Sequence, residues 1–153
     1  MPESRYARVE RERRFILREV PTGVVRVVHI EDHYLDGTRL RLREMTDQDG
    51  TVVRKLGHKV RLSGDAREVA HTSLYLDDAE WALLRGLPAR RLRKTRHVVE
   101  RDGLTVAVDV FEDGTVLAEI YDGDEPPVAT PTWLSVLLDV TDDERWTGAE
   151  LAR

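Results

Sequence analysis

The chain has 153 residues, a net charge of −5, 35% charged residues and no cysteine. This length suits one domain, which we expect to span residues 1–153. The acidic balance argues against a nucleic-acid-binding protein, and the lack of cysteine excludes disulfides, thiolate nucleophiles and cysteine metal sites. No apolar run approaches the roughly 20 residues of a membrane-spanning helix, so we expect a cytoplasmic monomer or homodimer with no membrane partner.

The first predicted strand, near residues 5–17, carries alternating charges. Glu10, Glu12 and Arg14 share a parity, and because strand side chains repeat every two residues, all three point to one face. Two inward-facing acids are costly as packing but suit a divalent cation. On an exposed face the same acids would form minor ion pairs with Arg41 or Arg43, and the spacing alone leaves the two interpretations about equal.

Further β-patterned segments follow, separated by turn sequences such as Asp36-Gly37 and Asp102-Gly103. Together with the first segment they predict an antiparallel meander of about eight strands. We place these strands near residues 5–17, 24–34, 38–45, 51–61, 67–76, 91–101, 104–111 and 115–121.

Two segments break the β pattern. Residues 77–86 have acids in the first turn, apolar residues at helical spacing and Gly86 at the end, which predicts a helix. In the tail, Thr141 is followed three residues later by Glu144, and this capping-box pattern predicts the start of a second helix.

Most predicted strands have one apolar and one ionic face. The cations that share a parity within their strands are Arg39, Arg41, Arg43, Lys55, Lys59, Arg61, Lys94 and Arg96. A solvated face is the ordinary explanation, favoured roughly two to one by patterning alone. An internal site is favoured because like charges opposite each other destabilise a sheet, and because acids gather on other strands. These acids are Glu10, Glu12, Asp109 and Glu119.

An ionic face turned inward would create a charged tunnel, because a closed barrel of about eight strands has room for one small ligand. Arginines and lysines there would bind a polyanion such as a phosphate chain. The carboxylates would hold Mg²⁺ or Mn²⁺, which bridges protein acids to substrate phosphates. We therefore expect an α+β fold, a closed eight-stranded antiparallel β-barrel with a few flanking helices.

Several motifs occur in a fixed order along residues 5–150. They are Glu10-Arg11-Glu12-Arg13-Arg14, Tyr34-Leu35, Arg41-Leu42-Arg43, Arg54-Lys55-Leu56-Gly57, Lys94-Thr95-Arg96, Val108-Asp109-Val110-Phe111, Leu117-Ala118-Glu119-Ile120 and the tail from Val140 to Trp146. In this order they resemble the CYTH superfamily, also called triphosphate tunnel metalloenzymes. That family includes inorganic triphosphatases, thiamine triphosphatases and class IV adenylate cyclases.

The resemblance implies metal-dependent hydrolysis of a triphosphate. Inorganic tripolyphosphate is the expected substrate, with nucleoside triphosphate, thiamine triphosphate or an organic diphosphate as alternatives. The implied ligands of Mg²⁺ or Mn²⁺ are Glu10, Glu12, Asp109 and Glu119, and these residues with Lys55 form the implied catalytic set. The implied phosphate-binding residues are Arg14, Arg39, Arg41, Arg43, Lys55, Lys94 and Arg96.

The sequence departs from the family pattern at several positions. The middle acidic strand offers only Glu68, with His71 or Ser73 where an acid is expected, and Tyr121 replaces the second acid near the end. Gly148 stands where the family has asparagine. The missing acids favour an alternative, a polyphosphate- or nucleotide-binding module that does not hydrolyse its ligand. An adenylate cyclase on the same scaffold and a charged β-domain used for protein interaction are further alternatives.

Overall fold

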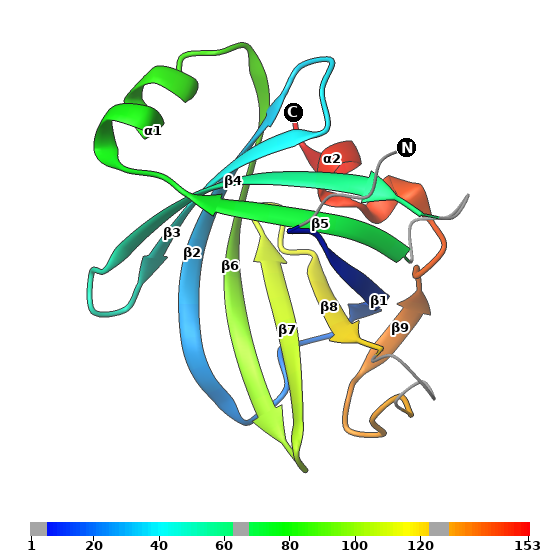
Figure 1. The fold of residues 1–153 in the computed structure, drawn as a ribbon. Coiled ribbons are helices and arrows are strands. Elements are labelled where there is room, and N and C mark those ends of the chain that lie inside the picture. Colours follow the sequence, from blue (N-terminus) through cyan, green and yellow to red (C-terminus); the bar gives the residue numbers. More distant parts are fainter. Residues whose placement is uncertain (1–5, 63–67, 123–128) are drawn as a thin grey trace.

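The computed structural model describes residues 6–62, 68–122 and 129–153, and their main element is a closed antiparallel barrel (Figure 1). The strands follow the order β5-β4-β3-β2-β6-β7-β8-β1, and β1 pairs with β5 to close the cylinder. The fold class and the eight predicted strands are therefore confirmed, with ends that differ by a few residues. The strands are β1 (Arg8–Leu17), β2 (Val24–Leu35), β3 (Leu40–Asp47), β4 (Val52–Arg61), β5 (Glu68–Tyr75), β6 (Ala89–Arg101), β7 (Leu104–Phe111) and β8 (Val116–Tyr121).

Strand β1 closes the barrel because its two halves have different partners. Glu10 in the first half lies opposite Val69 of β5, and Arg14 in the second half lies opposite Glu119 of β8. The second half also pairs with an additional strand, β9 (Val136–Asp139), which the sequence did not predict. All four residues of β9 are exposed, so it lacks the alternation of buried and exposed positions that identifies the other strands.

The helix predicted at residues 77–86 is confirmed as α1 (Asp78–Leu84). Its capping box is complete, since the Asp77 side chain accepts from the Glu80 backbone N–H at 2.8 Å and the Glu80 side chain accepts from the Asp77 N–H at 2.9 Å. The buried Trp81 packs the helix against Leu35 and Leu42 on the outside of the barrel.

The helix predicted to begin at Thr141 begins later. The Thr141 hydroxyl accepts from the Arg14 backbone N–H at 3.0 Å and donates to Asp139 at 2.6 Å, so it binds the tail to β1 instead of capping a helix. The tail then forms the 3₁₀ helix η1 (Glu144–Trp146) and the short helix α2 (Gly148–Leu151). Among the described residues, the helices are all too short or too polar to cross a membrane.

The ionic face of the sheet points into the barrel, as predicted. The apolar core lies on the outer face of the strands, under the segments that pack against it. One apolar cluster, which includes Phe15, Val106 and Val108, packs against Leu134, and a second lies under α1. Inside the barrel, Val28, Ile30 and Leu117 share the inner face with buried charged side chains. These charged residues are Arg14, Asp32, Arg41, Arg43, Lys94 and Asp109. The fold thus positions ions from nearly every strand around one interior space.

Candidate active site

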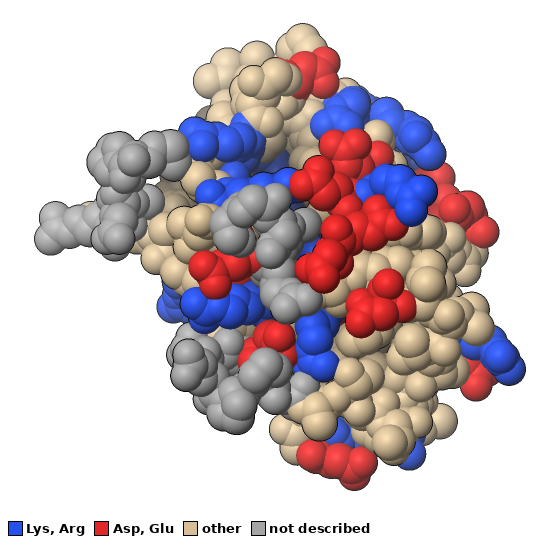
Figure 2. All heavy atoms as spheres, turned by 90° about the vertical axis from the view of Figure 1, so that its right-hand side faces the viewer, with Lys and Arg blue, Asp and Glu red and all other residues tan. Residues whose placement is uncertain are grey.

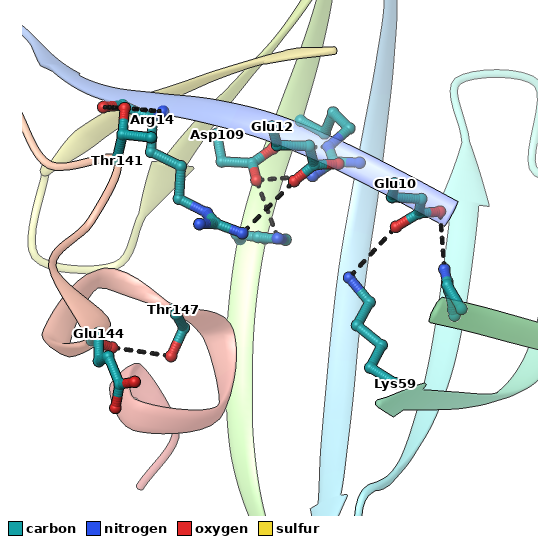
Figure 3. A network of polar contacts seen from close by, with 11 residues as sticks. Glu10, Glu12, Arg14, Lys59, Asp109, Thr141, Glu144 and Thr147 are labelled. Carbon is teal, nitrogen blue, oxygen red and sulfur yellow. Dashed lines mark hydrogen bonds and ion pairs between the residues drawn. The ribbon is translucent and has the colours of Figure 1, made fainter. Parts of the chain in front are cut away.

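A chamber of about 140 Å³ lies inside the barrel, and we call it the inner chamber. Among the described residues, six cations and three acids line it, together with Tyr34, His71 and Gly148. Figure 3 shows Glu10, Glu12 and Arg14 on β1, near Lys59 and Asp109 of other strands. The six cations are Arg14, Arg41, Arg43, Lys59, Lys94 and Arg96, and the three acids are Glu10, Glu12 and Glu119. Most of the predicted site residues are therefore in one place.

Two of the chamber acids form a carboxyl pair. The negative charge of Glu119, together with burial, raises the pKa of Glu12 to about 8, so Glu12 keeps its proton at neutral pH and hydrogen-bonds to Glu119. Burial by itself would raise the pKa of Glu119, but Arg96 and Lys94 hold it well below its usual range. An acid that keeps its proton beside an ionised acid is ready to exchange that proton for a cation.

Glu10 lies in a separate contact with His71 and Lys59. Its carboxylate is 2.8 Å from His71 Nδ1 and 3.8 Å from Lys59 Nζ (Figure 3). Burial opposes ionisation of Glu10, but the hydrogen bond from His71 and the charge of Lys59 lower its pKa. His71, one of the two residues predicted to stand where the family pattern has an acid, thus faces the chamber and favours the ionised form of Glu10.

Asp109 is fully buried and contacts two cations. Its two oxygens accept from Arg96 Nε at 2.7 Å and Arg96 Nη2 at 2.8 Å, and Lys94 Nζ lies 2.8 Å from the second oxygen. In this arrangement Asp109 orients two phosphate-binding candidates. A metal ion at Asp109 would have to compete with Arg96 and Lys94 for the carboxylate oxygens. The assignment of Asp109 as a metal ligand therefore stays a prediction.

Asp32 forms a matching unit on the opposite side of β6, and sequence reasoning missed it. It is fully buried and accepts from Arg43 Nε at 2.7 Å and Arg43 Nη2 at 2.8 Å, while Arg41 Nε lies 3.9 Å away. Burial opposes the charge of Asp32, but Arg43 and Arg41 lower its pKa well below its usual range. The alternation along β2 places Asp32 on the same face as Tyr34, and this pattern could have identified it.

Not all predicted phosphate-binding residues lie in the inner chamber. Lys55 lies beside the Tyr75 ring, 5.4 Å from its centroid, and lines neither this chamber nor the chamber next to it. Lys59 of the same strand, which was not predicted to bind phosphate, lines the inner chamber instead. Arg39 lines that neighbouring chamber. The roles of Lys55 and Arg39 stay predictions. Tyr121 is exposed, although its strand neighbour is Glu12.

Gly148 of α2 forms part of the chamber wall. A Cβ atom at this position would lie 2.0 Å from the Tyr34 hydroxyl oxygen and 3.0 Å from the ring carbon that carries it. The absence of a side chain therefore allows α2 to lie directly against Tyr34. The Tyr34 hydroxyl in turn hydrogen-bonds with Arg41, so the tail contacts the phosphate-binding candidates through one tyrosine.

The inner chamber contains a pair of carboxyl groups that suits a divalent metal ion. Mg²⁺ and Mn²⁺ are commonly held by one or two carboxylates plus the phosphates of a substrate, and Glu12 and Glu119 are such a pair. Among the residues described, no three histidine or acidic side chains form a cluster that could hold a metal ion by themselves. A metal here would therefore complete its coordination with water or with the oxygens of a bound substrate.

The charge in the inner chamber differs from that on one outer face of the molecule. Figure 2 shows acidic and basic side chains intermixed on the face that forms the right-hand side of Figure 1. The chamber has twice as many cations as acids among its described lining residues. The fold and this interior define a closed antiparallel barrel with a cationic, carboxylate-containing chamber.

Several solved structures are similar to this chain, among them the following three. The crystal structure of the inorganic triphosphatase NE1496 matches with a TM-score of 0.59 and 25% identity, over 94% of this chain and 97% of that one. A conserved hypothetical protein from Pyrococcus furiosus matches with a TM-score of 0.54 and 23% identity, over 76% of this chain and 81% of its own. The PH1012 protein from Pyrococcus horikoshii matches with a TM-score of 0.54 and 16% identity, over 75% of this chain and 80% of its own.

No protein-family model and no curated protein sequence matches the chain. The two Pyrococcus proteins show the fold alone. The similarity to an inorganic triphosphatase extends over nearly the full length of both chains and supports a triphosphatase-like function.

Proposed function

We propose that this chain is a divalent-metal-dependent triphosphatase of the CYTH superfamily, with inorganic tripolyphosphate as a substrate. The observation that carries the proposal is the content of the inner chamber, where six cations surround a hydrogen-bonded carboxyl pair. Cations bind phosphate oxygens, and the carboxyl pair can bind a metal ion. The similarity to an inorganic triphosphatase supports the reaction class.

The arginines of the chamber would bind and orient the phosphate chain. Phosphoryl transfer requires little covalent chemistry from the protein, so positioning and charge neutralisation supply most of the catalysis. Arg43 and Arg96 suit this role because Asp32 and Asp109 fix their guanidinium groups through paired hydrogen bonds. The remaining N–H groups of each arginine stay free to donate to phosphate.

Glu12 and Glu119 would hold the metal, with Glu10 beside them. A bound Mg²⁺ or Mn²⁺ would neutralise the charge that develops on the phosphates and promote ionisation of a bound water. Glu12 would release its proton when the metal binds. Glu10 would stay ionised, because His71 and Lys59 stabilise its charge.

The size of the inner chamber favours a short phosphate chain over a nucleoside. Pockets for drug-sized ligands measure roughly 300–1,000 Å³, and the chamber measures about 140 Å³. An adenosine or thiamine group would therefore have to lie outside it. Tripolyphosphate has no such group, so the inner chamber alone can account for its binding.

The proposal is tested by phosphate release from tripolyphosphate, pyrophosphate, ATP and thiamine triphosphate, each with Mg²⁺, Mn²⁺ or a chelator. We expect release from tripolyphosphate that depends on the metal and is lost in Glu12→Gln. The matched control is Glu112→Gln, since Glu112 is exposed on the β7–β8 turn and should not affect turnover. Release that continues with a chelator, or in Glu12→Gln, would contradict the proposal.

A second candidate is a module that binds polyphosphate without hydrolysing it. Two observations favour it: the described residues contain no preformed cluster of three metal ligands, and both oxygens of Asp109 already contact cations. Binding of tripolyphosphate without metal-dependent release of phosphate would support this candidate.

A further inference from the structure

A second chamber of about 220 Å³ adjoins the inner one, and we call it the outer chamber. The two chambers share Arg14, Tyr34, Arg41, Lys59 and Gly148 as lining residues, so they meet where Gly148 lies against Tyr34. Arg39, Arg61 and Arg90 line the outer chamber only and belong to the barrel end near α2. Nothing in the proposed hydrolysis of tripolyphosphate assigns a role to Arg61 or Arg90.

The lining of the outer chamber favours an anion. Six of the lining residues are cations and, among the described residues, none is acidic, in contrast to the three acids of the inner chamber. A nucleoside or thiamine group would favour aromatic rings for stacking, and Tyr34 is the aromatic residue in this lining. Its hydroxyl hydrogen-bonds with Arg41, and this end of the side chain lies against Gly148. One aromatic ring beside six cations favours an anion over a stacked group.

We infer that the outer chamber binds the phosphate groups that follow those held in the inner chamber, so that linear polyphosphates longer than three phosphates bind more tightly than tripolyphosphate. The inference rests on the proposed function, because it assumes that the inner chamber holds one end of a phosphate chain. Arginine suits such a site because its guanidinium can donate two parallel hydrogen bonds to one phosphate.

Two of the outer arginines also contact the tail. Arg61 forms an ion pair with Glu144 of η1, and Arg90 Nη1 donates to the Ala149 carbonyl at 2.5 Å. Each guanidinium carries five N–H donors, so these contacts leave donors for a phosphate. They also raise the alternative that Arg61 acts only as a structural link to η1. Glu144 offers a matched control, because its replacement breaks that link without removing a cation from the chamber.

The test is calorimetric titration of the full chain with tripolyphosphate and with a longer linear polyphosphate, in the presence of a chelator that prevents hydrolysis. We expect the longer chain to bind more tightly. We expect Arg61→Gln and Arg90→Gln each to weaken binding of the longer chain by about tenfold more than binding of tripolyphosphate, the loss expected for one charged hydrogen bond. Glu144→Gln should keep the preference for the longer chain, and Arg61→Lys should retain part of it.

The outcomes separate this inference from the proposed function. Equal binding of both phosphate chains by a protein that hydrolyses tripolyphosphate would overturn the inference and leave the proposed function intact. Equal losses in Arg61→Gln and Glu144→Gln would assign Arg61 a structural role and also overturn it. Failure of the unaltered protein to bind either chain would overturn the inference, and the metal-dependent release of phosphate from tripolyphosphate would then decide the proposed function separately. Melting curves of each variant identify any that does not fold, and Arg90→Gln then provides the independent measurement.

Discussion

Glu12 and Glu119 form a hydrogen-bonded carboxyl pair inside the barrel. Their strands are neighbours, and the pairing of Glu12 with Tyr121 and of Arg14 with Glu119 makes the two acids diagonal neighbours on one face. Long side chains reach each other across such a diagonal. Because Arg96 and Lys94 stabilise the charge of Glu119, the proton resides on Glu12. The pair is therefore neutralised in part by a proton that a metal could replace.

The first prediction concerns proton release on metal binding. A proton on Glu12 competes with a cation for the same oxygens, so the affinity for Mn²⁺ should increase as pH rises and level off above the Glu12 pKa of about 8. Titration calorimetry in buffers with different protonation enthalpies should show roughly one proton released per Mn²⁺ near pH 7 and far less near pH 9. The titrations should include a triphosphate analogue that cannot be hydrolysed, since the substrate supplies ligands.

Glu12→Gln should abolish this proton release and weaken Mn²⁺ binding at least tenfold. The glutamine keeps the shape of the side chain and can still donate to Glu119, so the fold should persist. Glu112→Gln should behave like the unaltered protein. An Mn²⁺ affinity that does not depend on pH between about 6 and 9 would argue against the Glu12 proton as the competing ion.

The second prediction concerns the buried pair of Asp32 and Arg43. Asp32→Asn should lower the free energy of unfolding by about 3–5 kcal/mol, because it leaves the Arg43 charge buried without its partner. The pKa of Asp32 is lowered in the folded protein, so the pair stabilises the fold above the ordinary aspartate pKa of 3.8 and this contribution is lost as pH falls. Urea unfolding over a range of pH measures both effects, and Asp32→Asn should flatten the acid dependence.

Asp47→Asn is the matched control for this pair. Asp47 also contacts an arginine, Arg26, but the Arg26 side chain is 49% exposed, so solvent screens the interaction. We expect little change in stability. Similar losses in the two variants would mean that burial of the Asp32 pair has no special effect.

The third prediction concerns Gly148. Gly148→Ala places a Cβ 2.0 Å from the Tyr34 hydroxyl oxygen, so either α2 or Tyr34 must move. We expect a lower melting temperature and weaker tripolyphosphate binding, with partial recovery when Tyr34→Phe removes the clashing oxygen. Gly86→Ala is the control, since its Cβ would meet its nearest neighbour at an ordinary 3.6 Å. A fully stable Gly148→Ala with unchanged binding would show that the tail does not form a fixed wall.

The fourth prediction distinguishes two lysines of β4. Lys59 lines both chambers, whereas Lys55 lines neither, although both point to the inner face. Lys59→Gln should weaken tripolyphosphate binding by about tenfold, the effect of losing one charged hydrogen bond, and Lys55→Gln by less than about twofold. Calorimetric titration of both variants with tripolyphosphate measures these affinities. A larger effect of Lys55→Gln than of Lys59→Gln would support the phosphate-binding role predicted for Lys55 from the sequence.

Local sequence features predicted much of the fold. Alternation of apolar and charged residues identified eight strands, and capping residues identified α1, because both depend on side chains close together in the chain. The same alternation placed Glu12, Arg43 and Asp109 on one face. It failed for β9, whose residues are all exposed, and for the tail, where Thr141 binds β1 instead of beginning a helix.

The sequence by itself determined that one face of the sheet is ionic and which residues belong to it. Only the tertiary structure decided that this face is enclosed, because closure depends on pairing β1 with β5, nearly 60 residues away along the chain. Closure also determined which ions meet: Asp32 with Arg43, Glu12 with Glu119, and Lys59 instead of Lys55 beside Glu10. A strand pattern gives the direction of each side chain, but distances between ions follow from the register and curvature of the whole barrel.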